Sequence, residues 1–387
     1  MRLLSRTPTH TTLITDRGGL GALHSAWRDL LARSAADTIF LTPEWTEAWL
    51  HAYGTGEGLR VVAVYRGDRL IGLAPLALRR AGAREWPLQA RLCFAADGSA
   101  DSDYLDIIAA RGEEKAAFEA VMAQVEAFGD RWHALAWNET PQTSPTLAAL
   151  RGWLNARGWF VETQDVPCAR VDLPGSWDGY LKTLKPRMRT KVRSLLKKAD
   201  ADPDLVFDRC TAETDLPERL ESLYALHRSR WELRGQDGIF TEPAKRAFYE
   251  RMSRDFLAAG WLRFYSLRWG GQYIAHQFCF ERGGTMSLLQ EGFDKAWADA
   301  GVGNTLRALV FRDCVERGVA VYDFLAGVTP HKLAWGAHQT HNLRLLAAPP
   351  GWRSRGYAGA RRVVRTGKRY RGAVQAQLRG LRRRGEG

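Results

Sequence analysis

The stretch LRVVAVYRGDRLIGLAPLALRR, residues 59–80, has a counterpart later in the chain in LRFYSLRWGGQYIAHQFCFER, residues 262–282. Each consists of a strand-like run with a period of two, a Gly-Asp or Gly-Gly pair, and a second run of the same kind. A period of two is typical of a β-strand, and a glycine-containing pair between two such runs predicts a β-hairpin. The sequence therefore predicts the same hairpin twice.

The segments around the two hairpins also correspond. Before each hairpin we expect a strand and two helices, and after it a strand, a helix, a strand, a helix and a last strand. This order fills residues 1–173 and again residues 201–348. We therefore predict two domains of one architecture, joined by a basic segment at 174–200 and followed by a basic tail at 349–387.

The net charge of +13 belongs mainly to that tail. Residues 351–387 hold twelve Lys and Arg and one acid, Glu386, so the body of the protein is near neutral. A domain built to hold nucleic acid usually spreads a basic face over its own surface, so nucleic acid is not the expected partner. We see no apolar run long enough for a membrane span, no signal peptide and no cysteine framework, which favours a cytoplasmic protein.

The segment LKTLKPRMRTKVRSLLKK, residues 181–198, carries eight basic side chains and no acid. Its apolar residues recur at steps of three and four, which predicts an amphipathic helix whose long part starts near Pro186. We expect its apolar stripe to pack on the second domain and its cations to attract coenzyme A phosphates, an anionic saccharide or an anionic lipid. A similar pattern in the tail predicts either a cationic helix at the inner face of the membrane or a disordered tail; its apolar members are Val363, Tyr370, Val374, Leu378 and Leu381.

Four motifs give the chain a resemblance to a known family. They are FLTPEWTEAW (40–49), HRSRWELRGQDGIF (227–240), GGQYIAHQF (270–278) and YDFLAGVTPHKLAW (322–335). With the element order, they resemble GNAT acyltransferases, in the tandem form of FemABX-related proteins, and specifically the CelD/BcsL-type acetyltransferases associated with bacterial exopolysaccharide synthesis. The resemblance covers about residues 38–347 and implies an α/β (α+β) fold of two tandem GNAT-like domains, each a mixed, mostly antiparallel sheet flanked by helices.

The resemblance places the acyl-CoA site at AWADAGVGNTLRAL, residues 296–309. There Gly301, Val302 and Gly303 would offer backbone N–H groups to the pyrophosphate, Asn304 or Thr305 would cap the helix, and Arg307 would meet a phosphate. The alternative is a glycine-containing turn without a ligand. The Arg or Gln that usually opens this loop in the family is Ala298 here.

The first domain reads IIAARGEEKAAF, residues 107–118, at the same point. Glu113 and Glu114 at the helix start would repel a pyrophosphate. We therefore expect the donor site in the second domain and a scaffold or acceptor role for the first.

Candidates for catalysis lie on the predicted strands and loops of the second domain. Asp323, on an apolar strand, would be a base if burial raised its pKa; otherwise it is a strand-end carboxylate. The resemblance implies that Lys332 polarises an acyl carbonyl or holds an anionic substrate. His276 and Glu291 are further candidate bases, with a core histidine as the alternative for His276. The predicted acceptor-binding residues are Arg230, Trp231, Asp103 and Trp335.

Two other clusters, one of acids and one of histidines, do not have the spacing of a metal site. The acids of ADGSADSDYLD, residues 96–106, do not fit an EF-hand loop, and we expect them to line a cleft. His331, His338 and His341 lack the spacing of a zinc site.

Together these residues predict direct transfer of an acetyl or similar acyl group from acyl-CoA to an amine or hydroxyl of an exopolysaccharide or cell-envelope precursor. Two alternatives stay open: a Fem-like transferase that uses aminoacyl-tRNA to modify a peptidoglycan precursor, and a non-catalytic scaffold of a polysaccharide synthase complex.

Overall fold

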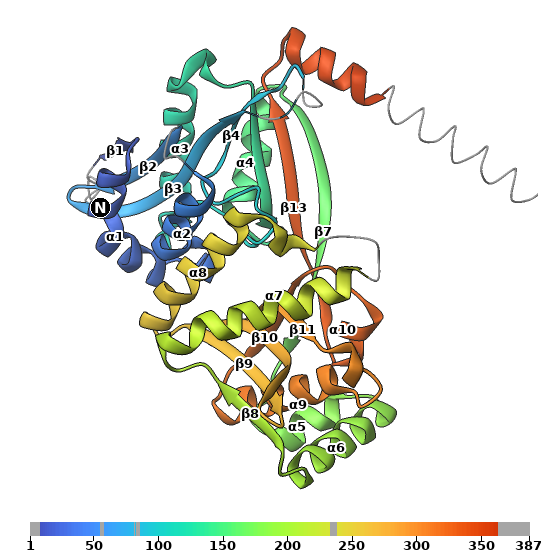
Figure 1. The fold of residues 1–387 in the computed structure, drawn as a ribbon. Helices are drawn as coiled ribbons and strands as arrows, with labels where there is room; N and C mark the ends of the chain where they lie inside the picture. Colours follow the sequence, from blue (N-terminus) through green and yellow to red (C-terminus); the bar gives the residue numbers. More distant parts are fainter. Residues whose placement is uncertain (1–7, 55–57, 81, 83–85, 233–237, 363–387) are drawn as a thin grey trace, which may run out of the picture.

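A computed structural model describes residues 8–54, 58–80, 82, 86–232 and 238–362 (Figure 1). The first unit contains, in chain order, β1 (Thr9–Ile14), α1 (Arg17–Ala32), α2 (Pro43–Tyr53), β2 (Leu59–Arg66), β3 (Arg69–Arg80), β4 (Ala90–Phe94), β5 (Ile108–Ala109), α3 (Glu114–Ala127), β6 (Ala134–Pro141), α4 (Pro145–Ala156) and β7 (Phe160–Asp172).

The second unit repeats this order after two linking helices, α5 (Trp177–Thr183) and α6 (Pro186–Ala201). It contains β8 (Leu205–Arg209), α7 (Leu216–Glu232), α8 (Pro243–Ala258), β9 (Leu262–Trp269), β10 (Gln272–Arg282), β11 (Thr285–Phe293), α9 (Val302–Glu316), β12 (Val321–Ala326), α10 (Pro330–Ala334) and β13 (His338–Ala348). The predicted fold class and both predicted hairpins, β2–β3 and β9–β10, are confirmed.

The two units share one 13-stranded sheet because they exchange their last strands. The strand order is β1-β2-β3-β4-β6-β13-β7-β12-β11-β10-β9-β8, with β5 paired to β3. The last strand of the first unit, β7, therefore pairs with β12 of the second, and β13 returns to pair with β6 of the first. Figure 1 shows β7 and β13 as two long strands side by side that run from one unit into the other. The two predicted domains, residues 1–173 and 201–348, therefore contribute their strands to one continuous sheet.

A helical contact also joins the units. Phe248 of α8 packs edge-on against Trp45 of α2, with 5.2 Å between ring centroids, and against Tyr53 at the end of the same helix. Both helices follow a short 3-10 turn that contains Ile-Phe, residues 39–40 and 239–240, and both start at a proline. The two units therefore meet through equivalent helices.

The basic segment forms the predicted amphipathic helix. Helix α6 starts at Pro186 and buries Val192, Leu195 and Leu196 against the second unit, beside α9. Its lysines and arginines are exposed, apart from the half-buried Arg189, whose guanidinium donates to backbone carbonyls at the end of α5. The predicted apolar positions of the tail lie outside the described residues, which end in a short helix over 352–362.

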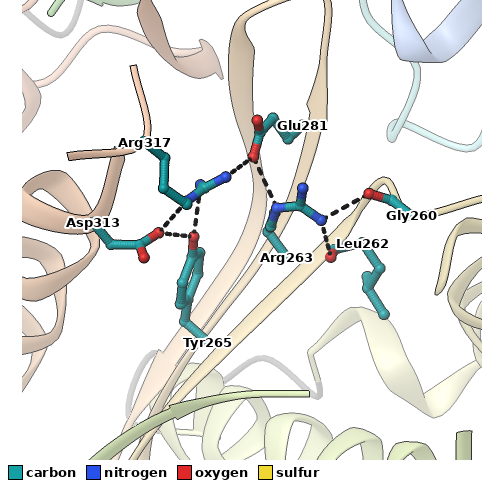
Figure 2. Close-up of polar contacts among 7 residues, drawn as sticks. All are labelled: Gly260, Leu262, Arg263, Tyr265, Glu281, Asp313 and Arg317. Carbon is teal, nitrogen blue, oxygen red and sulfur yellow. Dashed lines mark hydrogen bonds and ion pairs between the residues drawn. The ribbon is translucent and has the colours of Figure 1, made fainter. Parts of the chain in front are cut away.

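A polar network fixes the far end of α9. Arg317, just after the helix, pairs with Asp313 at 2.8 Å and with Glu281 of β10, and it donates to the hydroxyl of Tyr265 (Figure 2). Arg263 of β9 pairs with the same Glu281 carboxylate at 2.8 Å. Because several charge-assisted bonds converge on one point, α9 is held in a fixed direction across the sheet, with its N-terminus at the candidate site.

Among the described residues, no helix is both long enough and apolar enough to cross a bilayer.

Candidate active site

The sheet opens between β11 and β12. These parallel strands pair only over Thr285–Ser287 and Val321–Asp323, and beyond that point they separate. A bulge in β12 contributes to this opening, since Asp323 pairs with Arg170 of β7 but the next pair is Ala326 with Cys168. Leu325 within the bulge has a φ of +57°, a conformation that costs a branched residue energy and that the surrounding structure must stabilise. A gap bounded by two strand edges is thus built into the second unit.

Helix α9 points its N-terminus at this gap. Gly301 stands before the helix with a φ of +74°, which favours glycine. Gly303 is needed for close packing instead, because an added Cβ would lie 3.1 Å from Phe293 of β11. The backbone N–H groups of Val302 and Gly303 have no side-chain cap, and the described residues supply no other acceptor for them. Two free donors at a helix start are a ready site for an anion.

The predicted cap by Asn304 or Thr305 is wrong. The helix begins at Val302, because the left-handed Gly301 already turns the chain into it, so both residues lie inside the first turn. The Asn304 side chain contacts His331 at 3.0 Å instead. The helix start is therefore left open.

A cavity of about 500 Å³ lies in front of this helix start. Its lining brings together most of the residues predicted from the donor and catalytic motifs, which lie far apart in the sequence: His276, Glu291, Gly301, Gly303, Asn304, Arg307 and Lys332. The buried amide of Gln277 also lines it, and its Nε2 has no hydrogen-bond partner.

Arg307 does not take the predicted place at a phosphate. Its side chain is buried, forms an ion pair with Glu291 and lies over the rings of Phe324 and Trp335. A guanidinium held in this way supports the floor of the cavity and restrains Glu291, which lies on β11 beside the gap. The ion pair with a cation also makes Glu291 a poor candidate for the base.

Lys332 holds the end of β12. Its ammonium donates to the carbonyl oxygens of Phe324 at 2.9 Å, Ala326 at 3.0 Å and Gly327 at 2.7 Å. All three donors of the side chain are occupied, so the predicted direct bond to an acyl carbonyl is not available in this arrangement. Burial lowers the pKa of Lys332 from its usual value, and the nearby carboxylates oppose that change. Its role here is to place a positive charge beside the gap and to fix the strand end.

Asp323 is the last residue of β12 that pairs with β11, at the apex of the gap, and it is almost fully buried. One carboxylate oxygen accepts from the hydroxyl of Tyr104 at 2.8 Å and lies 3.4 Å from Nε of Arg170, and the other accepts from the N–H of Leu325. Burial raises the pKa of Asp323, while Arg170, Leu325 and Tyr104 act in the opposite direction. The carboxylate is thus oriented and moderately basic, as a general base requires.

Asp103 lies behind Asp323. Its carboxylate accepts from the Asn342 side-chain amide at 3.3 Å and is 7% exposed. Burial, followed by the charges of Glu139 and Asp323, raises the pKa of Asp103 to about 7. Because Asp103 is shielded by its neighbours, it offers little surface to an acceptor, and its predicted contact with one stays a prediction.

A second cavity, of about 630 Å³, lies between the two units and contains Asp323 in its wall. Its lining comes from both units and is rich in polar groups: Asp37, Tyr104, Asp106, Arg170, Arg282, Ser287, His341 and Asn342. The Asn342 side-chain oxygen is buried and has no hydrogen-bond partner. Asp323 thus stands at the apex of the gap and borders this second cavity as well.

Two predicted site residues are core residues. His276 is fully buried, its ring nitrogens lie 2.9 Å from the hydroxyls of Ser266 and Ser222, and burial lowers its pKa to about 3. The two occupied ring nitrogens and the lowered pKa favour the alternative of a core histidine over the prediction of a base. Trp335 is also fully buried and packs on Phe311, so it is not an acceptor-binding residue.

The remaining acceptor candidates, Arg230 and Trp231, lie in α7, and their side chains are outside the part that the structure describes. In the described part, no group of three or more His, Cys, Asp or Glu side chains is arranged to hold a metal ion.

Sequence reasoning missed Tyr104, Arg170 and Gln277. Tyr104 lies 219 positions from Asp323 in the chain and belongs to the other unit, so no local pattern connects them. The sequence did contain a signal that the two units are equivalent. An Ile-Phe pair followed by a proline occurs at residues 39–43 and again at residues 239–243.

A family model matches the part of the chain that holds this site. The model described as an acetyltransferase (GNAT) domain matches residues 186–333, the part that contains α6, the gap, the open helix start and Lys332. The comparison with curated proteins finds none that matches this sequence.

Solved structures confirm the fold over nearly the whole chain. FemX is similar with a TM-score of 0.63 and 11% identity, over 87% of this chain and 96% of that one. A protein of unknown function from Bacteroides thetaiotaomicron gives 0.57 and 13%, over 88% and 100%. The C-terminal domain of a putative lysylphosphatidylglycerol synthetase from Agrobacterium fabrum gives 0.51 and 13%, over 86% and 92%. The chain thus has a tandem GNAT-like fold.

Proposed function

We propose that this protein is an acyltransferase that moves an acyl group from a coenzyme A thioester to an amine or hydroxyl of an acceptor, with the second unit as the catalytic one. The observation that carries the proposal is the open start of α9, where the Val302 and Gly303 N–H groups face no partner beside a gap in the sheet. GNAT domains take the pyrophosphate of acyl-CoA at this position, and the free N–H groups fit that anion.

Helix α6 supplies charge next to the same turn. An added Cβ on Gly301 would lie 3.4 Å from Cδ2 of Leu195, so α6 runs against the turn. Lys191 and Lys198 lie one helical turn to either side of Leu195 and are exposed. We propose that these lysines attract the phosphates of the donor and compensate for Ala298, where the family usually has Arg or Gln.

The chemistry would take place at the apex of the gap. The acceptor nitrogen or oxygen attacks the thioester carbonyl carbon. The carbon–sulfur bond then breaks, and coenzyme A leaves as the thiolate. Asp323 accepts the proton that the acceptor loses. Tyr104 and Arg170 hold Asp323 in position, and Lys332 contributes positive charge near the carbonyl oxygen as it becomes negative.

The acceptor would enter from the cavity between the units. Its hydroxyl, amide and guanidinium groups suit a polyhydroxylated or amino-bearing molecule more than an apolar one. Together with the resemblance to CelD/BcsL-type proteins, this favours an exopolysaccharide or cell-envelope precursor.

A second candidate is a transferase that takes its acyl group from aminoacyl-tRNA. Two observations favour it: the similarity to FemX, and the exposed cations of α6, none of which forms an ion pair with a described residue. A charged helix beside the donor site would serve a polynucleotide as well as a nucleotide.

Isothermal titration with coenzyme A, set against an electrophoretic shift with charged tRNA, separates the two donors. We expect binding of coenzyme A that weakens when Lys191 and Lys198 are both changed to Glu. Binding of tRNA without binding of coenzyme A would overturn the proposal in favour of the second candidate. A structure with coenzyme A bound checks the site, since the pyrophosphate must contact the N–H groups of Val302 and Gly303.

A further inference from the structure

Two tryptophans are exposed together at the end of the first unit. Trp86 is 60% exposed and Trp352 is 57% exposed, and among the large apolar side chains of the described residues these are the two highest values. Their ring centroids are 6.4 Å apart although they come from distant segments. A pair of large aromatic side chains in solvent costs free energy unless something covers it.

The fold holds this pair in place. Trp352 begins the short helix over 352–362, and Tyr357 of that helix is buried against Phe160 of β7. Arg361, one turn further, pairs with Glu162 of β7 at 2.7 Å. The helix is therefore docked on the first unit through one face and presents Trp352 beside Trp86.

The surroundings of the pair are positively charged. The guanidinium of Arg353 lies 4.7 Å from the centre of the Trp352 ring, and neither Arg353 nor Arg355 forms an ion pair with a described residue. The sequence from residue 351 to the end has twelve basic residues and one acid. Aromatic rings beside arginines are the composition that an anionic membrane surface attracts, since indole rings favour the headgroup region.

We infer that Trp86 and Trp352, together with Arg353 and Arg355, form a peripheral anchor for an anionic lipid surface. The anchor lies away from the donor site: in Figure 1 the helix over 352–362 is at the opposite end of the molecule from α6. A protein held in this way keeps its donor and acceptor cavities open to the solution next to the membrane. The inference is independent of the reaction that the protein catalyses.

Co-sedimentation of the full chain with phosphatidylcholine vesicles, with and without phosphatidylglycerol, tests the anchor. We expect binding only to the anionic vesicles, and about tenfold weaker binding for the double variant Trp86→Ala/Trp352→Ala and for Arg353→Glu/Arg355→Glu. The matched control is Trp269→Ala, because Trp269 is also exposed and also contacts a second tryptophan, Trp297, but lies at the hairpin of the second unit. This variant should bind as the wild type does.

Equal binding by the double tryptophan variant and the wild type would overturn the inference, as would absence of binding to anionic vesicles. A shift of tRNA that depends on Trp86 and Trp352, without vesicle binding, would assign the surface to nucleic acid and would also overturn it. Circular dichroism of each variant checks that the fold is retained; exposed side chains of this kind contribute little to stability.

Discussion

The two units of this protein share one architecture and differ from each other at two places. In the first unit β6 has the bulge that β12 has in the second, with Glu139 at φ +54° where the second unit has Leu325. At the position equivalent to Asp323 the first unit has Trp137, a buried core residue. The bulge is therefore a property of the fold, and a carboxylate at its edge is a property of one unit.

The second difference lies in the connection from strand to helix. In the second unit residues 294–301 lead directly from β11 to the open start of α9. In the first unit a long loop over residues 95–107 and the short strand β5 separate β4 from α3. That loop bonds to the bulge of its own unit, through the Leu105 N–H to Glu139 and from Asn138 to Asp97. At the start of α3, Glu113 pairs with Arg66. In the first unit a loop and a carboxylate thus lie where the second unit has a gap in the sheet and an open helix start.

The loop also serves the second unit. Asp101 forms a buried ion pair with Lys245 of α8 and accepts from Tyr249, and Tyr104 reaches Asp323. The first unit thus has no open helix start of this kind among its described residues, and its loop contributes to the wall around the other site. Four predictions test this division.

Asp323→Asn should have the largest effect, because it removes the proton acceptor from the site. We expect kcat to fall by roughly 10² to 10⁴-fold, measured as thiol release from acetyl-CoA with a panel of amino sugars and polyols. Asp97→Asn, which changes a half-buried acid in the loop of the first unit, should leave the rate unchanged. Equal losses in the two variants would contradict the assignment of catalysis to the second unit.

Lys245→Ala should destabilise the contact between the units. Removal of one partner leaves the buried carboxylate of Asp101 uncompensated, and we expect the free energy of unfolding in urea to fall by roughly 3 kcal/mol. Lys115→Ala is the control, because its pair with Glu119 is exposed, and it should cost less than about 0.5 kcal/mol. A negligible effect of Lys245→Ala would show that the loop does not join the units energetically.

Asn304→Glu should give the second unit a helix start like that of the first. A carboxylate in the first turn of α9 would compete for the free N–H groups and repel a phosphate, so KM for acyl-CoA should rise about tenfold with a smaller change in kcat. Asn304→Gln keeps the size without the charge and should resemble the wild type. An unchanged KM in the glutamate variant would place the donor elsewhere.

Tyr104→Phe should have the smallest effect and the most specific one. The hydroxyl of Tyr104 stabilises the ionised form of Asp323, so its loss raises the pKa of Asp323 further. Because the base must be ionised, activity appears as pH rises through that pKa, and the acidic limb of kcat/KM should move to higher pH by up to about one unit. Tyr65→Phe in β2 should leave the limb in place.

The sequence by itself determined the elements of this fold. The alternation in the two hairpins, the proline at the start of α6 and its apolar stripe each predict a structure that forms from neighbouring residues. Such patterns indicate which face of a helix or strand is buried. The glycines at 301 and 303 were found for the same reason, since a turn has a local signature.

Only the tertiary structure decided which residues meet. The exchange of β7 and β13, the contact of Tyr104 with Asp323 and the burial of His276 all depend on segments that pair across the molecule. A side chain's pattern along the chain does not specify its partner, because packing free energy depends on neighbours in space. Thus His276 and Asp323 look alike in sequence, as polar residues on apolar strands, and the fold makes one a core residue and places the other at the apex of the gap.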